Sequence, residues 1–380
     1  MKPKYSEEFA FLLDVCRTYL GTGRLSKASR QFAISNPEAA LMVIRRHRLV
    51  GIALKALEHE TELASIGKLL GDLKQQTSFK AMQQVRLLAE LKALFSPVSL
   101  DFMTLKGVAF SHRAYGDIGM RSSRDVDILV KPAHLLKCHD TLVENGFDLV
   151  NPKIELTQAN AGVIQRLTNQ LSYLSPGGQY LEVHWRLFKF SNQIPITEET
   201  IWSEAETIQI ANHSFLVLGE TIQFRYMMVH GAKHQYASLY WLMDIAIILK
   251  NAKLSMASEL AYARRNNTLR SLILTLELLK RHFAIQETDK YEMSKGTERM
   301  VEACIEEQLA DDSVAQGFFT RIKQFWFRLK LKAGVRDKFA QIQLVSIGDY
   351  QLFALPSGLL FLYPLLKPFL FIYKNTLSRR

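Results

Sequence analysis

Two aspartates one residue apart constrain this chain more than any other feature of its sequence. Asp125 and Asp127 stand in the run Arg-Asp-Val-Asp-Ile-Leu-Val, which is otherwise apolar after its arginine. This run predicts a strand, and because successive side chains of a strand point to opposite faces, both carboxylates project together. Neighbouring like charges resist joint ionisation, and a hard divalent cation with oxygen ligands removes that cost. The pair therefore indicates a metal site, although Asp-x-Asp pairs also cap turns and lie on solvated strands.

The residues around this strand predict a small unit of mixed helices and strands. Short apolar runs predict strands, and amphipathic stretches that begin at proline or end at glycine predict helices. In chain order we expect a strand over 102–105, a helix over 108–115, the aspartate strand over 125–130 and a helix over 132–145. Gly107 follows the first strand, and its lack of a Cβ lets the backbone approach a ligand closely.

A β-hairpin is expected to complete the unit. Two stretches, 171–175 and 180–187, flank the turn Pro176-Gly177-Gly178. Polar and apolar residues alternate in the second stretch, so Glu182 and His184 share one face of the predicted strand. The alternation therefore places a third carboxylate on a polar face, where a metal site would require it.

Helices are expected on both sides of this unit. From about residue 198 onward the apolar spacing is again helical, most clearly over 222–234, 239–250, 254–265 and 269–283. We expect an α+β protein with a small mixed-sheet core and helical flanks. Its four predicted parts are an N-terminal helical region (1–97), the core (98–190), a C-terminal helical domain (191–335) and an apolar, proline-broken segment (336–380).

Charge and cysteine content narrow the classes of partner. The net charge of +11 favours anionic partners, although a generally basic surface explains it equally well. The basic residues are dispersed, and we expect no nucleic-acid substrate. The three cysteines, Cys16, Cys138 and Cys304, form no Cys-x-x-Cys motif, which argues against a disulfide framework or zinc knuckle. The N-terminus leads into an amphipathic helix rather than a secretion signal, so we expect a cytoplasmic protein.

The C-terminal segment leaves one alternative open. Residues 352–373 are almost wholly apolar and are long enough to span a bilayer, but three prolines oppose a continuous helix. We expect this segment to be buried or packed on the protein surface. The basic, aromatic stretch 321–338 precedes it, and such a flank is also compatible with peripheral contact to an anionic membrane.

Four ordered motifs carry a resemblance. They are Leu-Lys-Gly at 105–107, Arg-x-x-x-Asp-x-Asp at 121–127, Glu-x-His-Trp at 182–185 and His-Gly-Ala-Lys-His at 230–234. Together they resemble an uncharacterised nucleotidyltransferase family of the DNA polymerase β-like superfamily. The resemblance implies a polymerase β-like mixed sheet. It also implies transfer of a nucleoside monophosphate from an NTP, ATP among the candidates, to a hydroxyl of a small molecule or protein, with release of pyrophosphate.

The resemblance also implies roles for individual residues. Asp125, Asp127 and Glu182 are expected to be catalytic and to bind Mg²⁺ or Mn²⁺. Arginine and lysine side chains suit phosphate contacts. Contacts with the nucleotide are expected from seven residues, namely Lys106, Gly107, Arg121, Arg124, His184, Lys233 and His234. No serine follows Gly107, unlike in the broader superfamily, so a nucleotide-binding module without catalysis stays an alternative. A membrane-peripheral enzyme with an envelope substrate is another.

Three residues near the last motif have competing interpretations. His230 and His234 are four apart, a spacing that suits zinc, but the sequence offers no third ligand. Packing of their helix against the core is the favoured interpretation. Asp244 lies in an otherwise apolar helix and is expected to pair with one of these basic residues or to cap a buried group.

Overall fold

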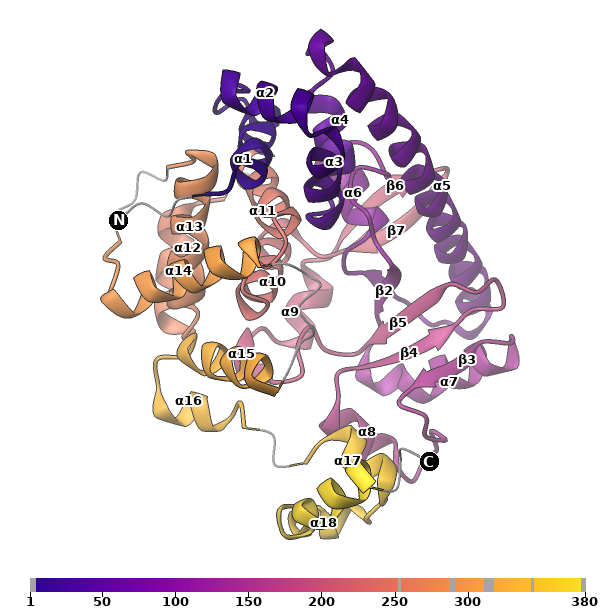
Figure 1. Ribbon diagram of the computed structural model, residues 1–380. Helices are drawn as coiled ribbons and strands as arrows, with labels where there is room; N and C mark the ends of the chain where they lie inside the picture. The colour runs from indigo at the N-terminus through magenta and orange to yellow at the C-terminus, as the bar shows by residue number, and fades with distance from the viewer. Residues whose placement is uncertain (1–4, 252–253, 287–290, 311–317, 343–344, 377–380) are drawn as a thin grey trace.

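A seven-stranded mixed sheet forms the centre of the computed structural model, which describes residues 5–251, 254–286, 291–310, 318–342 and 345–376 (Figure 1). The strand order is β3-β4-β5-β2-β1-β7-β6. The strands are β1 (Met103–Thr104), β2 (Asp125–Leu129), β3 (Asp148–Asn151), β4 (Gln170–Leu174), β5 (Tyr180–His184), β6 (Glu206–Ile210) and β7 (His213–Val217). The aspartate strand is therefore an interior strand of the sheet.

The pairing of β2 fixes the positions of the acidic residues. β2 pairs antiparallel with β1 and parallel with β5. The parallel register sets Asp127 opposite Glu182 and Leu129 opposite His184. The apolar residues Val126, Ile128 and Val183 belong to one hydrophobic cluster, as the predicted alternation requires. Asp127 and His184, on the other face, are buried too.

Among the described residues, five α-helices form the N-terminal part, and the last of them runs along the sheet (Figure 1). They are α1 (Glu7–Leu20), α2 (Lys27–Ser35), α3 (Pro37–Arg46), α4 (Val50–Ala56) and α5 (Ala64–Phe95). Ser6 caps α1 by accepting a hydrogen bond from the Phe9 amide. The long helix α5 contacts β2, and the Gln84 side chain donates to the backbone carbonyl of Asp125 at 3.3 Å.

The remaining helices follow the predicted order. Those that lie between strands of the sheet in the sequence are α6 (Val108–Tyr115), α7 (Leu135–Glu144), α8 (Ala161–Leu167) and α9 (Glu198–Ser203). Those of the C-terminal part are α10 (Glu220–Lys233), α11 (Tyr240–Asn251), α12 (Met256–Arg265), α13 (Leu269–Phe283) and α14 (Lys295–Leu309). They are followed by α15 (Phe318–Lys330), α16 (Val335–Phe339), α17 (Ile347–Leu352) and α18 (Tyr363–Thr376). The predicted α+β class, the hairpin and the helix over 108–115 are confirmed.

One prediction of helix is wrong. The helical reading from residue 198 onward misses β6 and β7, which pair as a hairpin over 206–217 and extend the sheet beyond β1. Ala211 and Asn212 both have positive φ, 47° and 66°, as a two-residue hairpin turn requires. An Ala-Asn turn carries a weaker sequence signal than Asn-Gly, which is why the hairpin escaped detection. The division into four parts stays a prediction.

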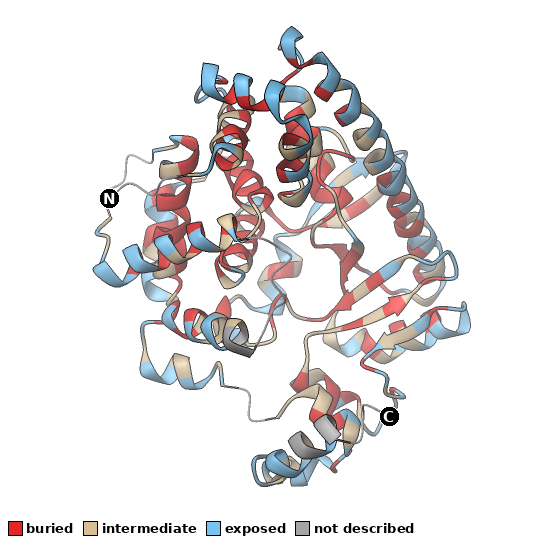
Figure 2. Cartoon of the chain, viewed as in Figure 1, coloured by how far each residue is buried: buried red, intermediate tan, exposed pale blue. Residues whose placement is uncertain are grey.

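The C-terminal segment packs on the protein. Tyr350, Leu355 and Tyr363 are buried in the hydrophobic core that also contains the β2 and β5 side chains. Other side chains of this segment are exposed (Figure 2). Among the described residues, no helix has the length and apolar character needed to cross a membrane. The predicted surface packing is thus confirmed for residues 347–370, whereas 343–344 and 377–380 lie outside the described residues.

Candidate active site

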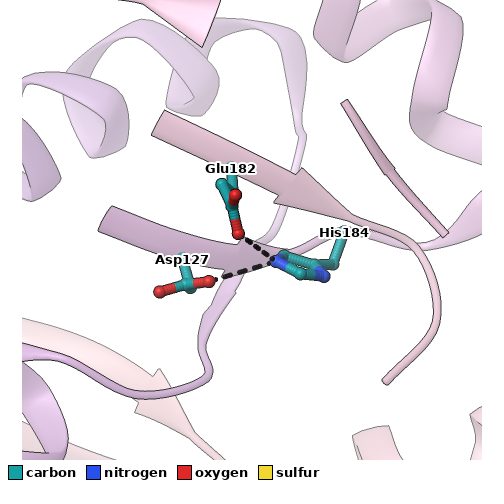
Figure 3. A group of neighbouring side chains, drawn as sticks. All are labelled: Asp127, Glu182 and His184. Carbon is teal, nitrogen blue, oxygen red and sulfur yellow. Dashed lines mark hydrogen bonds and ion pairs between the residues drawn. The ribbon is translucent and has the colours of Figure 1, made fainter. Parts of the chain in front are cut away.

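Three side chains meet where β2 and β5 lie next to each other. Asp127 and Glu182 are register partners, and His184 lies two residues beyond Glu182 on the same face. The His184 ring points between the two carboxylates, with Nε2 3.2 Å from Asp127 Oδ1 and 3.4 Å from Glu182 Oε2 (Figure 3). One ligand atom from each residue lies within 4.8 Å of those of the other two. The three form a group that can hold a metal ion.

Asp127 is the most buried member of this group. Its Oδ1 pairs with Lys106 Nζ at 3.0 Å as well as with His184. Burial alone would raise the pKa of Asp127, but the positive charge of Lys106 and the hydrogen bond from His184 hold that pKa well below its ordinary value. Asp127 is therefore ionised at neutral pH in the interior of the protein.

His184 belongs to the group that can hold a metal ion, whereas the sequence predicted only a contact with the nucleotide for it. Burial would lower its pKa, but hydrogen bonds to Asp127 and Glu182 raise the pKa above the ordinary value. Asn169 Nδ2 lies 3.4 Å from the other ring nitrogen, Nδ1. The sequence contained a signal for this position. Polar and apolar residues alternate along β5, so His184 shares a face with Glu182 and could have been predicted as a metal ligand on that ground.

Asp125 lies beside this group and not within it. Burial and the charge of Asp127 raise the pKa of Asp125 above its ordinary value. Its Oδ1 accepts a hydrogen bond from Ser123 Oγ at 3.3 Å. The structure thus brings all three predicted carboxylates to one place. Asp125 is the first residue of β2, and the hydrogen bond from Ser123 fixes its side chain there.

The segment after β1 supplies a cation and a glycine turn. The Leu105 amide donates to the Asp127 carbonyl at 3.1 Å, which fixes Lys106 next to the Asp127 side chain. Gly107 has φ of 73° and precedes α6, a conformation that side chains rarely adopt. Lys106 and Gly107 therefore lie at the site, as predicted for residues that contact a nucleotide.

Arg121 and Arg124 differ from each other in their surroundings. Arg121 is buried, and its Nε donates to Asp244 Oδ2 at 2.8 Å, while Tyr115 donates to Asp244 Oδ1 at 2.8 Å. Asp244 therefore pairs with Arg121 rather than with a basic residue of 230–234, and of its two expected roles the capping of a buried group is the one that the structure shows. Arg124 is exposed at the start of β2. Arg121 thus holds the loop before β2 in place through Asp244, whereas the sequence predicted that it contacts the nucleotide.

The histidines of α10 form an aromatic cluster. The His230 and His234 ring centroids are 4.8 Å apart, and the His234 ring stacks on Trp241 at 5.4 Å. In the ranges that the structure describes, the metal-capable group of three is Asp127, Glu182 and His184, and neither histidine of α10 belongs to one. Lys233 Nζ lies 6.0 Å from the centroid of the Phe188 ring.

The donor set fits a divalent cation. Asp127 Oδ2 is buried without a hydrogen-bond partner among the described residues. The other oxygen of this carboxylate, Oδ1, pairs with Lys106 and His184. A buried acceptor left unsatisfied is costly, and a cation would satisfy it. Carboxylate oxygens are the ligands that Mg²⁺ and Mn²⁺ prefer. Asp127, Glu182, His184 and the adjacent Asp125 are the residues that would hold the ion.

Comparison with known proteins agrees with this geometry. A family model described as "Uncharacterised nucleotidyltransferase" matches residues 35–284. No curated protein and no solved structure matches the chain. The matched range begins in α2, contains the sheet and ends at the residue that follows α13.

Proposed function

The chain belongs to this uncharacterised nucleotidyltransferase family, and from that premise we propose that it transfers a nucleoside monophosphate from an NTP to an acceptor hydroxyl. Pyrophosphate is the second product. The observation that carries the proposal is the register of β2 and β5, which sets Asp127 beside Glu182 with Asp125 close to both. Three carboxylates on two adjacent interior strands of a sheet, next to a glycine turn and a lysine, suit phosphoryl chemistry better than any other reaction class.

Nucleotidyl transfer depends on positioning and on neutralising charge more than on covalent help from the protein. Divalent cations, Mg²⁺ or Mn²⁺, would supply Lewis acidity toward the phosphate oxygens. Glu182 is more accessible than Asp127, since 23% of its side chain is exposed. It therefore suits acceptance of the proton from the acceptor hydroxyl. Gly107 lets the backbone approach the phosphates, and Lys106 provides a fixed positive charge.

The test is pyrophosphate release from each NTP, ATP first, with Mg²⁺ or Mn²⁺ and a pool of small-molecule hydroxyl acceptors. Asp127→Asn and Glu182→Gln are each expected to lower turnover at least about a hundredfold, because each removes a group aimed at developing charge. Asp148→Asn is the matched control, since Asp148 is an exposed aspartate on the edge strand β3 of the same sheet. Full turnover in Asp127→Asn would refute the proposal. Metal-dependent nucleotide binding without pyrophosphate release would favour the non-catalytic binding module.

Peripheral membrane contact is a second candidate property, because α18 and the turn before it expose a row of large apolar side chains. Phe361, Leu365 and Phe369 are each about 70% exposed and are spaced four residues apart. Such a row suits the surface of a lipid bilayer. Flotation with anionic vesicles is expected to recover the wild type and to lose Phe361→Ser/Phe369→Ser. Equal flotation of both proteins, or of neither, would refute this contact.

A further inference from the structure

A polar cavity lies between three elements, namely the segment after β5, the C-terminal end of α10, and α15. It has a volume of about 390 Å³, which suits a small molecule. Three basic side chains line it, from Lys189, Lys233 and Arg328, together with Gln193 and two phenylalanines. Among the residues that the structure describes, no carboxylate lines this cavity. The charge of this cavity is therefore strongly one-sided.

Two cations of this cavity, Lys233 and Arg328, have little compensation from carboxylates. Among the described residues, neither of them forms an ion pair, whereas the Asp349 carboxylate acts on the third cation, Lys189. Burial and the charge of Arg328 lower the pKa of Lys233 to about 8, and burial lowers that of Arg328 as well. Half-buried cations that repel one another are stabilised when an oxyanion binds between them.

An independent observation concerns Gln193. This side chain is 6% exposed, and its Oε1 has no hydrogen-bond partner among the described residues. Its Nε2 donates to Gln341 Oε1 at 3.3 Å, and Lys332 Nζ holds the backbone carbonyl of Asn192 at 2.7 Å. The loop that carries Gln193 is thus fixed in place, with an unsatisfied acceptor left for a donor such as a ligand hydroxyl.

A short chain of aromatic contacts connects the cavity with the three carboxylates. Lys233 lies near Phe188, whose ring centroid is 5.4 Å from that of Tyr226. Tyr226 lies within electrostatic reach of Lys106, Asp127 and Glu182, whose charges act on its hydroxyl. The cavity is therefore a neighbour of the candidate active site, reached along one face of α10.

We propose that this cavity, with Lys233 and Arg328 as its principal cations, binds a phosphate group of the acceptor, so that the acceptor is a phosphorylated small molecule with a free hydroxyl. This inference rests on the proposed nucleotidyl transfer. The nucleotide's own triphosphate is the other source of such a group. None of the lining residues comes from the Gly107 turn or from β2, where the phosphates of the nucleotide are expected. Lys233 lines the cavity, so the proposal reassigns this residue from the expected nucleotide contact to the acceptor. The cavity is thus assigned to the second substrate.

The experiment measures binding of inorganic phosphate by calorimetry, at constant ionic strength and without metal or nucleotide. Lys233→Gln/Arg328→Gln is expected to weaken that binding at least about tenfold, since it removes both charge-assisted contacts. Lys323→Gln/Lys330→Gln is the matched control, because both lysines lie on the exposed face of α15 and line no part of the cavity. A thermal melt of each variant verifies folding. Absence of phosphate binding to the wild type, or equal binding to the cavity variant, would overturn the proposal.

A second arm distinguishes the two sources of phosphate. Affinity for ATP with Mg²⁺ is expected to be unchanged within about twofold in the single variant Arg328→Gln, and saturation with ATP is expected to leave phosphate binding intact. A tenfold loss of ATP affinity in Arg328→Gln would assign the cavity to the triphosphate and overturn the acceptor assignment. Asp127→Asn separates the two hypotheses, because it should abolish turnover while phosphate binding to the cavity persists.

Discussion

Replacing one partner of the Arg121–Asp244 pair should destabilise the protein strongly. The side chains are only 6% and 1% exposed, and their Nε···Oδ2 distance is 2.8 Å. Asp244→Asn leaves the Arg121 charge buried and without its counter-ion. Breaking one side of a buried ion pair typically costs about 3–5 kcal/mol, a large fraction of the 5–15 kcal/mol that stabilises an ordinary domain.

Urea unfolding at neutral pH, followed by circular dichroism and tryptophan fluorescence, measures this cost. The double variant Arg121→Met/Asp244→Leu removes both charges and is expected to lose less stability than Asp244→Asn alone, because no uncompensated charge remains. A loss below about 1 kcal/mol in Asp244→Asn would refute the argument that this pair braces the loop before β2. A double variant whose loss equals the sum of the two single losses would refute it too.

Three further predictions concern stability and pH. Gly231→Ala is expected to lower the free energy of unfolding in urea by about 3 kcal/mol, because a Cβ there would overlap the buried ring of Tyr236. Gly71→Ala is the control, since the space around Gly71 is open, and it should be neutral or stabilising. Gly107→Ala should cost about 1–2 kcal/mol through its φ of 73° and should also weaken nucleotide binding, so unchanged binding of a fluorescent NTP analogue would contradict the assigned role. Burial, aided by the charges of Arg46 and His282, lowers the pKa of His47 to about 3. The folded protein therefore keeps His47 neutral, whereas the unfolded chain takes up a proton below about pH 6.5, so stability falls as pH drops from about 6.5 toward 3. Between pH 7 and pH 5 the loss from this residue is about 2 kcal/mol, and an identical pH dependence in His47→Gln would contradict the assignment.

The sequence predicted those parts of the site that depend on local periodicity. Alternation along β2 and β5 determines which side chains share a face, and that local property put Asp125, Asp127 and Glu182 together. The parallel register between these strands is a long-range property, and the sequence does not reveal which residue of one strand lies opposite Glu182. For the same reason, the position of His184 between two carboxylates became evident only in the structure.

The burial of ionisable side chains was the least predictable property. Arg45-Arg46-His47-Arg48 has the pattern of a solvated helix face, yet His47 is buried and its Nδ1 accepts the Leu239 amide at 3.1 Å. Arg121 is likewise hidden by tertiary contacts, with its guanidinium carbon 5.0 Å from the centroid of the Tyr240 ring. Whether an arginine meets phosphate or a buried aspartate depends on helices distant in sequence, which no local pattern specifies.

These distant contacts give a physical reason for the length of the family match. The strands that carry the acidic residues lie within 125–184, but the match spans 35–284. Gln84 on α5 holds the Asp125 carbonyl from one side, and Asp244 on α11 holds Arg121, in the loop before β2, from the other. Asp127 remains ionised while buried because Lys106 Nζ and His184 Nε2 lie 3.0 Å and 3.2 Å from its Oδ1, and the position of β2 determines both distances. The flanking helices are therefore part of the machinery that positions the carboxylates, and a fragment limited to the sheet should lose the site geometry even where its strands still pair.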